Sequence, residues 1–521
     1  MKSMARSEIE TRFDRYRPVV DEEEWSSMID AFTRPLPSTF WTHPTRVSSE
    51  WVADRFVKDG HPLSALSYAP GGYGAPTPMK WGRRFEFRAG LIHLQEASSM
   101  LPPIALDPKP GERVLDLCAA PGGKSAQLSL MMQNRGTLVV NDLSFARLRA
   151  LRATQERLGL RNMVLCAQEG QQLLKDHPPC FDKVLVDAPC SCEGTLRKRG
   201  KWTYEPDEGL FKRRLVSTQK ALLLQALRLT RSGGRVVYST CTLDPDENEG
   251  VVNSVLEEWS RLRATGEVSV DVDVEPIFFE GLKSAPGLTF WEGQKLSDAL
   301  IHALRVYPHH NDSGGFFLIS LRLGQRTEAE RSQAIQALES WARPRLCPQD
   351  EKREALRWVE DRFGIEEDQW GAVEFTEANS RYLSTVSEDL ILPPTRYQVA
   401  GLPSLYIRGA VPRLTSAASL EWGGFATRSV IELPSEESVD LYYSRVDQTL
   451  ESLALLRDDV QRGVYIVRYQ ERPLGLSYLS DQEGGRGMTL SSEYPKRIQL
   501  AEGHSAFEGP SLAERSWEER S

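Results

Sequence analysis

Strand-like apolar runs alternate with helix-like stretches between residues 86 and 325, and this alternation constrains the fold more than any other feature. The stretches 145–158 and 215–229 are predicted helices, and in the second the leucines recur near helical spacing. Strands that alternate with helices predict a parallel, doubly wound α/β sheet, whose ligands bind at the carboxyl ends of the strands. The predicted strands are 113–117, 137–141, 163–166, 183–187, 235–239 and 316–321.

A glycine-containing loop follows the first of these strands and leads into a helix. Glycines let the backbone approach a ligand closely, and the free amides of a helix start favour electron-rich groups. Asp142 follows the second strand, where a carboxylate can accept hydrogen bonds from ribose hydroxyls, although it could instead cap the helix that starts near Ser144. The loop and Asp142 together predict an adenosine-type ligand site. The loop residues are Cys118, Ala119, Ala120, Pro121, Gly122, Gly123 and Lys124.

Two cysteines directly follow other predicted strands. Cys190 lies in the motif Asp-Ala-Pro-Cys-Ser and Cys241 in the motif Tyr-Ser-Thr-Cys-Thr. A thiolate that adds to carbon 6 of cytosine makes carbon 5 nucleophilic enough to attack a methyl donor. Asp187, three residues before Cys190, can stabilise the charge that develops on the ring. The residues therefore predict methyl transfer to a thiolate-activated carbon, and their spacing leaves open which thiol attacks.

The remaining cysteines invite a simpler interpretation, because an unpaired cysteine usually behaves as a small buried hydrophobe. We expect this role for Cys192, although its place beside Cys190 leaves the assignment ambiguous. The same role is predicted for Cys118, Cys166, Cys180 and Cys347.

Length and composition limit the class of protein further. The chain has 521 residues, which predicts two to four domains, and its 7 cysteines lack paired zinc-binding spacing. Reduced thiols, no metal, no signal peptide and no membrane helix are expected, and they favour the cytoplasm. The net charge of −9 disfavours a general nucleic-acid coat but permits a local basic patch. The densest patch is Arg197-Lys198-Arg199, for which RNA contact and a solvated loop both stay open.

Six motifs resemble those of the Nop/Sun-type RNA cytosine-C5 methyltransferases, close to the bacterial RsmB/RsmF type. The resemblance covers roughly residues 86–325 and follows the order of motifs in that family. It implies a Rossmann-like, S-adenosylmethionine-dependent methyltransferase core flanked by an N-terminal RNA-binding region and a C-terminal PUA-like domain. The motifs are 95–100, 115–125, 141–142, 187–191, 238–248 and 308–309 with 315–317.

The resemblance also implies roles for individual residues. Cys241 corresponds to the nucleophile, and Cys190 to the thiol that helps to release the product. Asp187 contacts the cofactor, and Lys124 faces the active site. Glu169 stands where the family usually has Asp, and Cys192 stands where it has Gly. The expected contacts to S-adenosylmethionine come from Cys118 to Lys124 and from Asp142, Glu169 and Asp187.

The expected partner is RNA, with rRNA favoured over tRNA by the RsmF-like C-terminus, and neither a membrane nor a metal is expected. The oligomeric state is open, with a monomer preferred. The alternatives are a tRNA methyltransferase of the same family and a non-catalytic RNA-binding assembly factor; DNA methylation is disfavoured. Arg486, Lys496 and Arg497 are either phosphate contacts or a solvated face. The predicted units are 1–85 (RNA-binding), 86–325 (methyltransferase), 326–450 (connecting α+β), 451–505 (PUA-like) and 506–521 (disordered tail).

Overall fold

The computed structural model describes residues 5–75, 79–200, 202, 209–325, 340–379, 381–408, 411–455, 460–482 and 487–495. The charged sequence at 327–337 predicts a helix, and Lys201 adjoins the basic patch at 197–199, but both lie outside these residues. The same holds for the tail at 506–521 and the basic residues Arg486, Lys496 and Arg497. None of the helices within the described ranges is long and apolar enough to cross a membrane.

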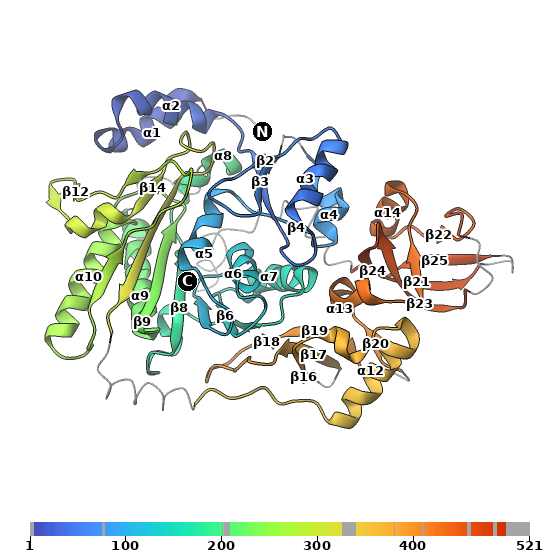
Figure 1. Cartoon of the computed structure of the whole chain (residues 1–521). Coiled ribbons are helices and arrows are strands. Elements are labelled where there is room, and N and C mark those ends of the chain that lie inside the picture. The colour runs from blue at the N-terminus through green and yellow to red at the C-terminus, as the bar shows by residue number, and fades with distance from the viewer. Residues whose placement is uncertain are drawn as a thin grey trace.

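A large central sheet organises the molecule (Figure 1). Five strands run parallel in the order β7-β6-β5-β8-β9, and β15 and β14 continue the sheet in antiparallel orientation. The six predicted strands are therefore confirmed, and two of them begin earlier than expected, β8 at Phe181 and β9 at Thr230. The bounds are β5 (Arg113–Asp116), β6 (Thr137–Asn141), β7 (Met163–Cys166), β8 (Phe181–Asp187), β9 (Thr230–Thr240), β14 (Leu304–Val306) and β15 (Phe316–Leu323).

Both faces of this sheet are covered, because alternate strand residues point to opposite sides. Val184 and Val186 pack into one apolar cluster with α9 (Gly209–Leu229) and α10 (Glu249–Ala264). Leu185, between them, packs into the other cluster. That cluster contains side chains of α5 (Leu101–Leu106), α6 (Gly123–Met131) and α7 (Phe145–Leu158). Burial on both faces explains why the strands read as continuous apolar runs.

The N-terminal region forms a second, smaller sheet in the order β2-β3-β1-β4, in which β2 is Ser64–Ala65. The glycines and prolines of segment 67–80 predict a loop, yet part of it is β3 (Gly72–Ala75), which pairs with β1 (Ser38–Thr42). The sheet ends with β4 (Ile92–Leu94), beyond the expected boundary at residue 85. Ahead of it, α1 (Arg6–Phe13) and α2 (Glu22–Thr33) lie over one edge of the central sheet, beside α8 (Leu196–Arg199) (Figure 1).

The C-terminal part contains two further sheets. One is antiparallel, with the order β16-β17-β19-β20, and the other has the order β21-β23-β24-β25-β22. The expected boundary between residues 450 and 451 falls inside the second sheet, because β21 (Val430–Glu432) and β22 (Gln448–Thr449) precede it. The other strands are β16 (Val373–Asn379), β17 (Tyr382–Ser387), β19 (Leu402–Tyr406), β20 (Arg413–Leu414), β23 (Gly463–Tyr469), β24 (Arg472–Asp481) and β25 (Met488–Ser492).

One strand from this part completes the central sheet. β18 (Val399–Ala400) pairs with β7 in antiparallel orientation, with Val399 opposite Leu165. The region expected only to connect two domains therefore supplies an edge strand of the central sheet.

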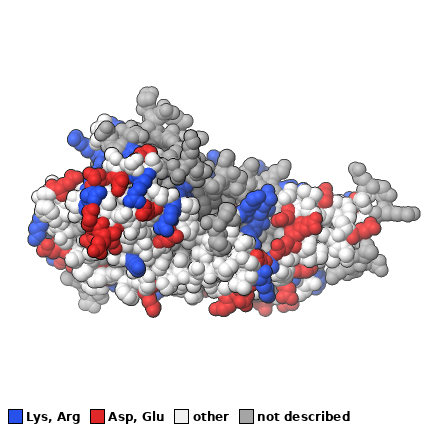
Figure 2. Space-filling model, turned by 90° about the horizontal axis from the view of Figure 1, so that it is seen from above, with Lys and Arg blue, Asp and Glu red and all other residues white. Residues whose placement is uncertain are grey.

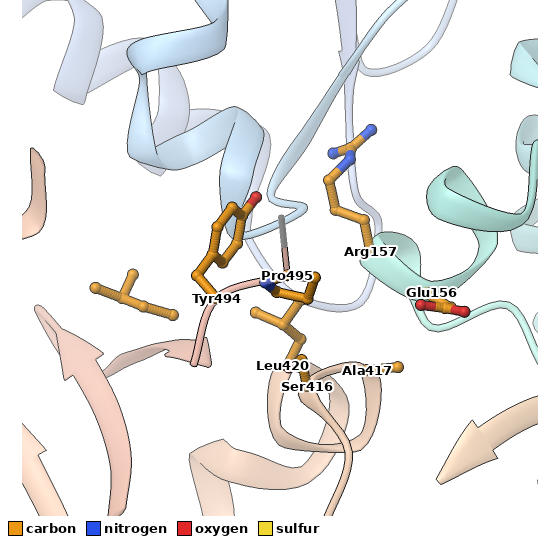
Figure 3. A pocket seen from close by; sticks show the side chains of 8 residues that line it. Glu156, Arg157, Ser416, Ala417, Leu420, Tyr494 and Pro495 are labelled. Atoms are coloured by element: carbon orange, nitrogen blue, oxygen red, sulfur yellow. The ribbon is translucent and has the colours of Figure 1, made fainter. Parts of the chain in front are cut away.

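The N-terminal and C-terminal regions share an apolar cluster and several polar contacts. The ring of Phe85 meets that of Tyr469 edge-on at 5.1 Å, and the Arg46 guanidinium lies 2.7 Å from Glu421. A small pocket between the central-sheet region and the C-terminal part is lined by α7, α13 (Ser416–Trp422), β24 and the segment after β25 (Figure 3). It contains no thiol and no residue of the glycine loop, so it belongs to the joint between regions. Its lining is Glu156, Arg157, Ser416, Ala417, Leu420, Leu474, Tyr494 and Pro495.

Candidate active site

The two motif cysteines meet at the carboxyl edge of the central sheet. Cys190 follows β8 and Cys241 follows β9, two neighbouring parallel strands. Their Sγ atoms lie 3.3 Å apart, although the residues are 51 positions apart in the chain. The sequence predicted neighbouring strand ends, and the structure brings the two thiols into contact there.

Hydrogen bonds fix the two loops that carry these thiols. The Gly194 amide donates to the Cys241 carbonyl at 2.9 Å, and the hydroxyls of Ser191 and Thr242 lie 2.7 Å apart. The carboxylate of Glu247 accepts from the Ser191 amide at 3.0 Å and from the side-chain amide of Gln219 at 2.8 Å. Glu247 lies in a motif that the sequence singled out, but its positioning of the Cys190 loop depends on contacts that only the fold creates.

Lys124 and Asp187 form an ion pair in the same site. Lys124 Nζ, on α6, lies 2.7 Å from Asp187 Oδ2, at the end of β8. The Ser239 hydroxyl donates to Asp187 Oδ1 at 2.9 Å, so both carboxylate oxygens have a partner. Burial lowers the pKa of Lys124, but Asp187 outweighs this effect and the net shift is upward. The pair therefore holds a charged ammonium in a largely buried position.

The glycine loop turns tightly between β5 and α6. Gly122 has φ = 109°, and a Cβ at this position would lie 2.7 Å from Leu151 Cγ, so the turn requires glycine. The Ala119 amide donates to the Asn141 carbonyl at 2.8 Å, which holds the loop against the end of β6. Below the loop, Asp116 Oδ2 accepts from the Ser125 hydroxyl at 2.6 Å, and burial raises the pKa of Asp116 to about 7.

Asp142 lies beside this loop at the end of β6. Its carboxylate accepts from the amides of Ala120 at 3.1 Å and Ser144 at 2.9 Å, and it pairs with Arg147 at 3.3 Å. The helix cap is Ser144, whose side chain accepts from the Arg147 amide. Asp142 is thus fixed against the loop, and a carboxylate has further lone pairs to accept from a ligand. Glu169 is exposed beyond the end of β7.

Cys192 was expected to be a small buried hydrophobe, but it lies within the cluster of thiols. Its Sγ lies 4.0 Å from that of Cys190, and the sulfur atoms of Cys190, Cys192 and Cys241 all lie within 4.8 Å of one another. The hydrogen bond from Cys190 lowers the pKa of Cys241, but contact with Cys192 and burial outweigh it and raise the pKa to about 12. Away from this group, burial raises the pKa values of Cys166 and Cys180 to about 12, as expected of inert thiols.

Arg197, the first residue of the basic patch at 197–199, fits neither of the two alternatives, an RNA-facing patch or a solvated loop. Arg197 is buried, and its guanidinium donates to the carbonyls of Ser313 at 2.9 Å and Pro35 at 3.0 Å. It therefore ties the N-terminal region to the core. Glu96 and, to a smaller extent, Cys241 act to raise the pKa of Lys198, but burial outweighs them and lowers it to about 8. On the face shown in Figure 2, Lys and Arg side chains lie among Asp and Glu side chains.

A family model matches the part of the chain that forms this site. The model described as 16S rRNA methyltransferase RsmB/F matches residues 103–322, which include the glycine loop and the three clustered thiols. A crystal structure of a methyltransferase homologue from Pyrococcus horikoshii has the same fold. It is 33% identical with a TM-score of 0.52, and the match covers 61% of this chain and 98% of that one.

The names of three relatives specify cytosine-C5 or ribosomal RNA methylation, on different RNAs. A tRNA (cytosine(49)-C(5))-methyltransferase of Pyrococcus abyssi is 37% identical over 47% of this chain and 74% of its own length. A 26S rRNA (cytosine-C(5))-methyltransferase of Caenorhabditis elegans is 33% identical over 57% of this chain. Ribosomal RNA small subunit methyltransferase F of Erwinia tasmaniensis is 39% identical over 46%. The chain spans less than half the length of these last two relatives, 44% and 47% respectively. On this evidence the chain belongs to the RsmB/F-type, or Nop/Sun, family of S-adenosylmethionine-dependent RNA cytosine-C5 methyltransferases.

Proposed function

We propose that this protein forms 5-methylcytosine in structured RNA, with rRNA as the substrate, through a covalent bond between Cys241 and carbon 6 of the target cytosine. The observation that carries the proposal is the 3.3 Å contact between the Cys190 and Cys241 thiols beside the Lys124–Asp187 pair. A site for a base requires groups that act on different ring atoms at once, and these four side chains provide them. The target base has to leave its stack to reach them.

In the proposed reaction, Cys241 Sγ loses its proton to solvent and bonds to carbon 6, which makes carbon 5 nucleophilic. The Lys124–Asp187 pair holds a proton that can be donated towards nitrogen 3 as negative charge develops on the ring. S-adenosylmethionine supplies the electrophilic methyl group. Cys190 Sγ, as the thiolate, then takes the proton from carbon 5. The bond between Cys241 and carbon 6 breaks to restore the aromatic ring, and nitrogen 3 returns its proton to the Lys124–Asp187 pair.

The residues of the glycine loop fit the cofactor. The Gly122 turn leaves no room for a side chain, so backbone amides of the loop can approach a ligand directly. Asp142 is held in place by the loop itself and can accept from ribose hydroxyls. Buried Asp116 has one carboxylate oxygen without a hydrogen-bond partner within the described residues. We propose that Cys118 to Lys124, Asp142, Glu169 and Asp187 hold S-adenosylmethionine.

The RNA is proposed to contact the N-terminal region, residues 1–85, and the C-terminal five-stranded sheet as a PUA-like module. Support comes from their arrangement, because both regions pack against each other beside the central sheet (Figure 1). Structured RNA that spans them would be positioned over the carboxyl edge.

The experiment is label transfer from methyl-labelled S-adenosylmethionine to unmodified host RNA, separated by size. Cys241→Ala serves as the inactive variant, and Cys347→Ala as a matched control at a distant buried thiol. Label in one rRNA band, recovered as 5-methylcytidine and absent with Cys241→Ala, supports the proposal. Label confined to tRNA would show that the substrate is tRNA and not rRNA. No label despite cofactor binding would favour a non-catalytic assembly factor.

A further inference from the structure

We infer that Cys190, Cys192 and Cys241 form a binding site for a soft d10 metal ion, for which Zn²⁺ is the probe. The three Sγ atoms all lie within 4.8 Å of one another, with separations of 3.3 Å between Cys190 and Cys241 and 4.0 Å between Cys190 and Cys192. Zinc–sulfur bonds of about 2.3 Å in tetrahedral geometry place neighbouring sulfur atoms about 3.8 Å apart. The thiols therefore need only small side-chain rotations to surround one ion.

The backbone conformation of Cys192 also supports a metal site. Cys192 has φ = 62° and ψ = 25°, in the left-handed region that a residue with a Cβ rarely adopts and that favours glycine. A cysteine at this position carries a conformational cost that glycine would avoid. In return, the turn directs a third sulfur towards the pair formed by Cys190 and Cys241. Strain of this kind at a chemical site suggests a function for the side chain.

The composition of the cluster selects the type of ion. It contains three sulfur atoms and neither imidazole nor carboxylate, and thiolate ligands favour Zn²⁺ or Cu⁺ over Mg²⁺ or Ca²⁺. Binding exchanges protons for the ion: three thiols and one Zn²⁺ give a tris-thiolate complex with one negative charge and three released protons. Nearby cations compensate this charge, because the Lys124 ammonium interacts electrostatically with Cys241 and the Arg199 guanidinium with Cys192. The fourth coordination position is left to water.

Occupation of this site has a consequence that rests on the proposed function. The ion would bind both Cys190 and Cys241, so neither thiol could react with cytosine. Zinc would therefore inhibit methyl transfer reversibly, and a chelator would restore it. Without Cys192, two thiols remain and the ion is held much more weakly.

The test measures zinc binding directly on the reduced, metal-free full-length chain, by competition with a chromophoric chelator. Cys192→Gly removes the third sulfur and suits the left-handed backbone, whereas Cys347→Ala removes a distant buried thiol as a control. We expect one tightly bound Zn²⁺ for the unmodified chain and for Cys347→Ala, and at least a 100-fold weaker affinity for Cys192→Gly. Equal affinity in Cys192→Gly, or no binding by the unmodified chain, would overturn the inference.

Two further measurements separate this site from the proposed function. Co²⁺ in place of Zn²⁺ should give thiolate-to-metal charge-transfer absorption that weakens strongly in Cys192→Gly, whether or not the protein methylates RNA. Label transfer is then measured for each variant with and without Zn²⁺, relative to its own zinc-free rate. Inhibition of the unmodified chain but not of Cys192→Gly is expected. Zinc binding without any methyl transfer would reject the proposed function and leave the metal site standing.

Discussion

Lys124 Nζ and Asp187 Oδ2 lie 2.7 Å apart, and they join the helix after the glycine loop to the strand that leads to Cys190. The Lys124 side chain is 13% exposed and that of Asp187 is 30% exposed, so the pair is largely shielded from water. Removal of one partner leaves the other charge buried, which is far more harmful than the loss of an exposed pair.

Asp187→Asn should therefore reduce methyl transfer by at least about 100-fold, a loss of roughly 3 kcal/mol of transition-state stabilisation. The amide cannot balance the ammonium, so the pKa of Lys124 should fall because its main raising influence is lost. The measurement is the initial rate of label transfer across pH. Asp298→Asn, at an 80% exposed carboxylate, is the control. An unchanged rate in Asp187→Asn would show that the pair has no part in the reaction.

Cys190→Ala should trap a covalent adduct with RNA, because Cys241 can still bond to carbon 6 while release is impaired. The adduct should appear as a slowly migrating band on denaturing gels after incubation with S-adenosylmethionine and RNA. Cys241→Ala and the double variant should give none. An adduct in Cys241→Ala but not in Cys190→Ala would reverse the roles assigned to the two thiols.

Glu247→Gln should change how stability depends on pH. Burial, followed by the charge of Asp244, raises the pKa of Glu247 to about 8, whereas an unfolded glutamate titrates near 4.3. Between these values the unfolded chain releases a proton that the folded chain keeps, so the free energy of unfolding falls as pH rises. Glutamine does not titrate, and its thermal midpoint should fall less between pH 5 and pH 8. Parallel curves for the two proteins would contradict the raised pKa.

Gly122→Ala should weaken the binding of S-adenosylmethionine and destabilise the fold by roughly 1–3 kcal/mol, because it puts a Cβ at a positive φ. The new methyl would also lie 2.7 Å from Leu151 Cγ and push the loop away from α7. Calorimetric titration with S-adenosylmethionine and thermal unfolding measure the two effects. Gly209→Ala is the matched control, since a Cβ there meets no atom within 4 Å. Similar affinities for both variants would show that the loop does not hold the cofactor.

The core strands could be predicted because burial on both faces leaves a continuous apolar run, as in residues 184–186. Strand β3 could not, since Gly72 and the neighbouring glycines and prolines indicate a loop, and only pairing with Trp41 makes the segment a strand. A short strand between two partners, here β2 and β1, depends on that pairing more than on its own residues.

In the active site too, some features are encoded by the local sequence and others depend on residues far away in the chain. The positions of Cys190 and Cys241 follow from strand ends, which are visible in the sequence. The direction of the Cys192 side chain depends on a left-handed turn, and no periodic pattern encodes it. Arg197 was misjudged because its partners, the carbonyls of Pro35 and Ser313, lie more than a hundred residues away in the chain.

The antiparallel pairing of β18 with β7 bears on how such proteins can be divided and recombined. A fragment that stopped at residue 325 would expose the backbone edge of β7, and unpaired edges invite association with other chains. A chimaera that exchanges C-terminal regions between relatives would keep its catalytic half well folded only if the exchanged piece brought a matching edge strand. The segment around Val399 is therefore the part of the C-terminal region that cannot be exchanged independently of the central sheet.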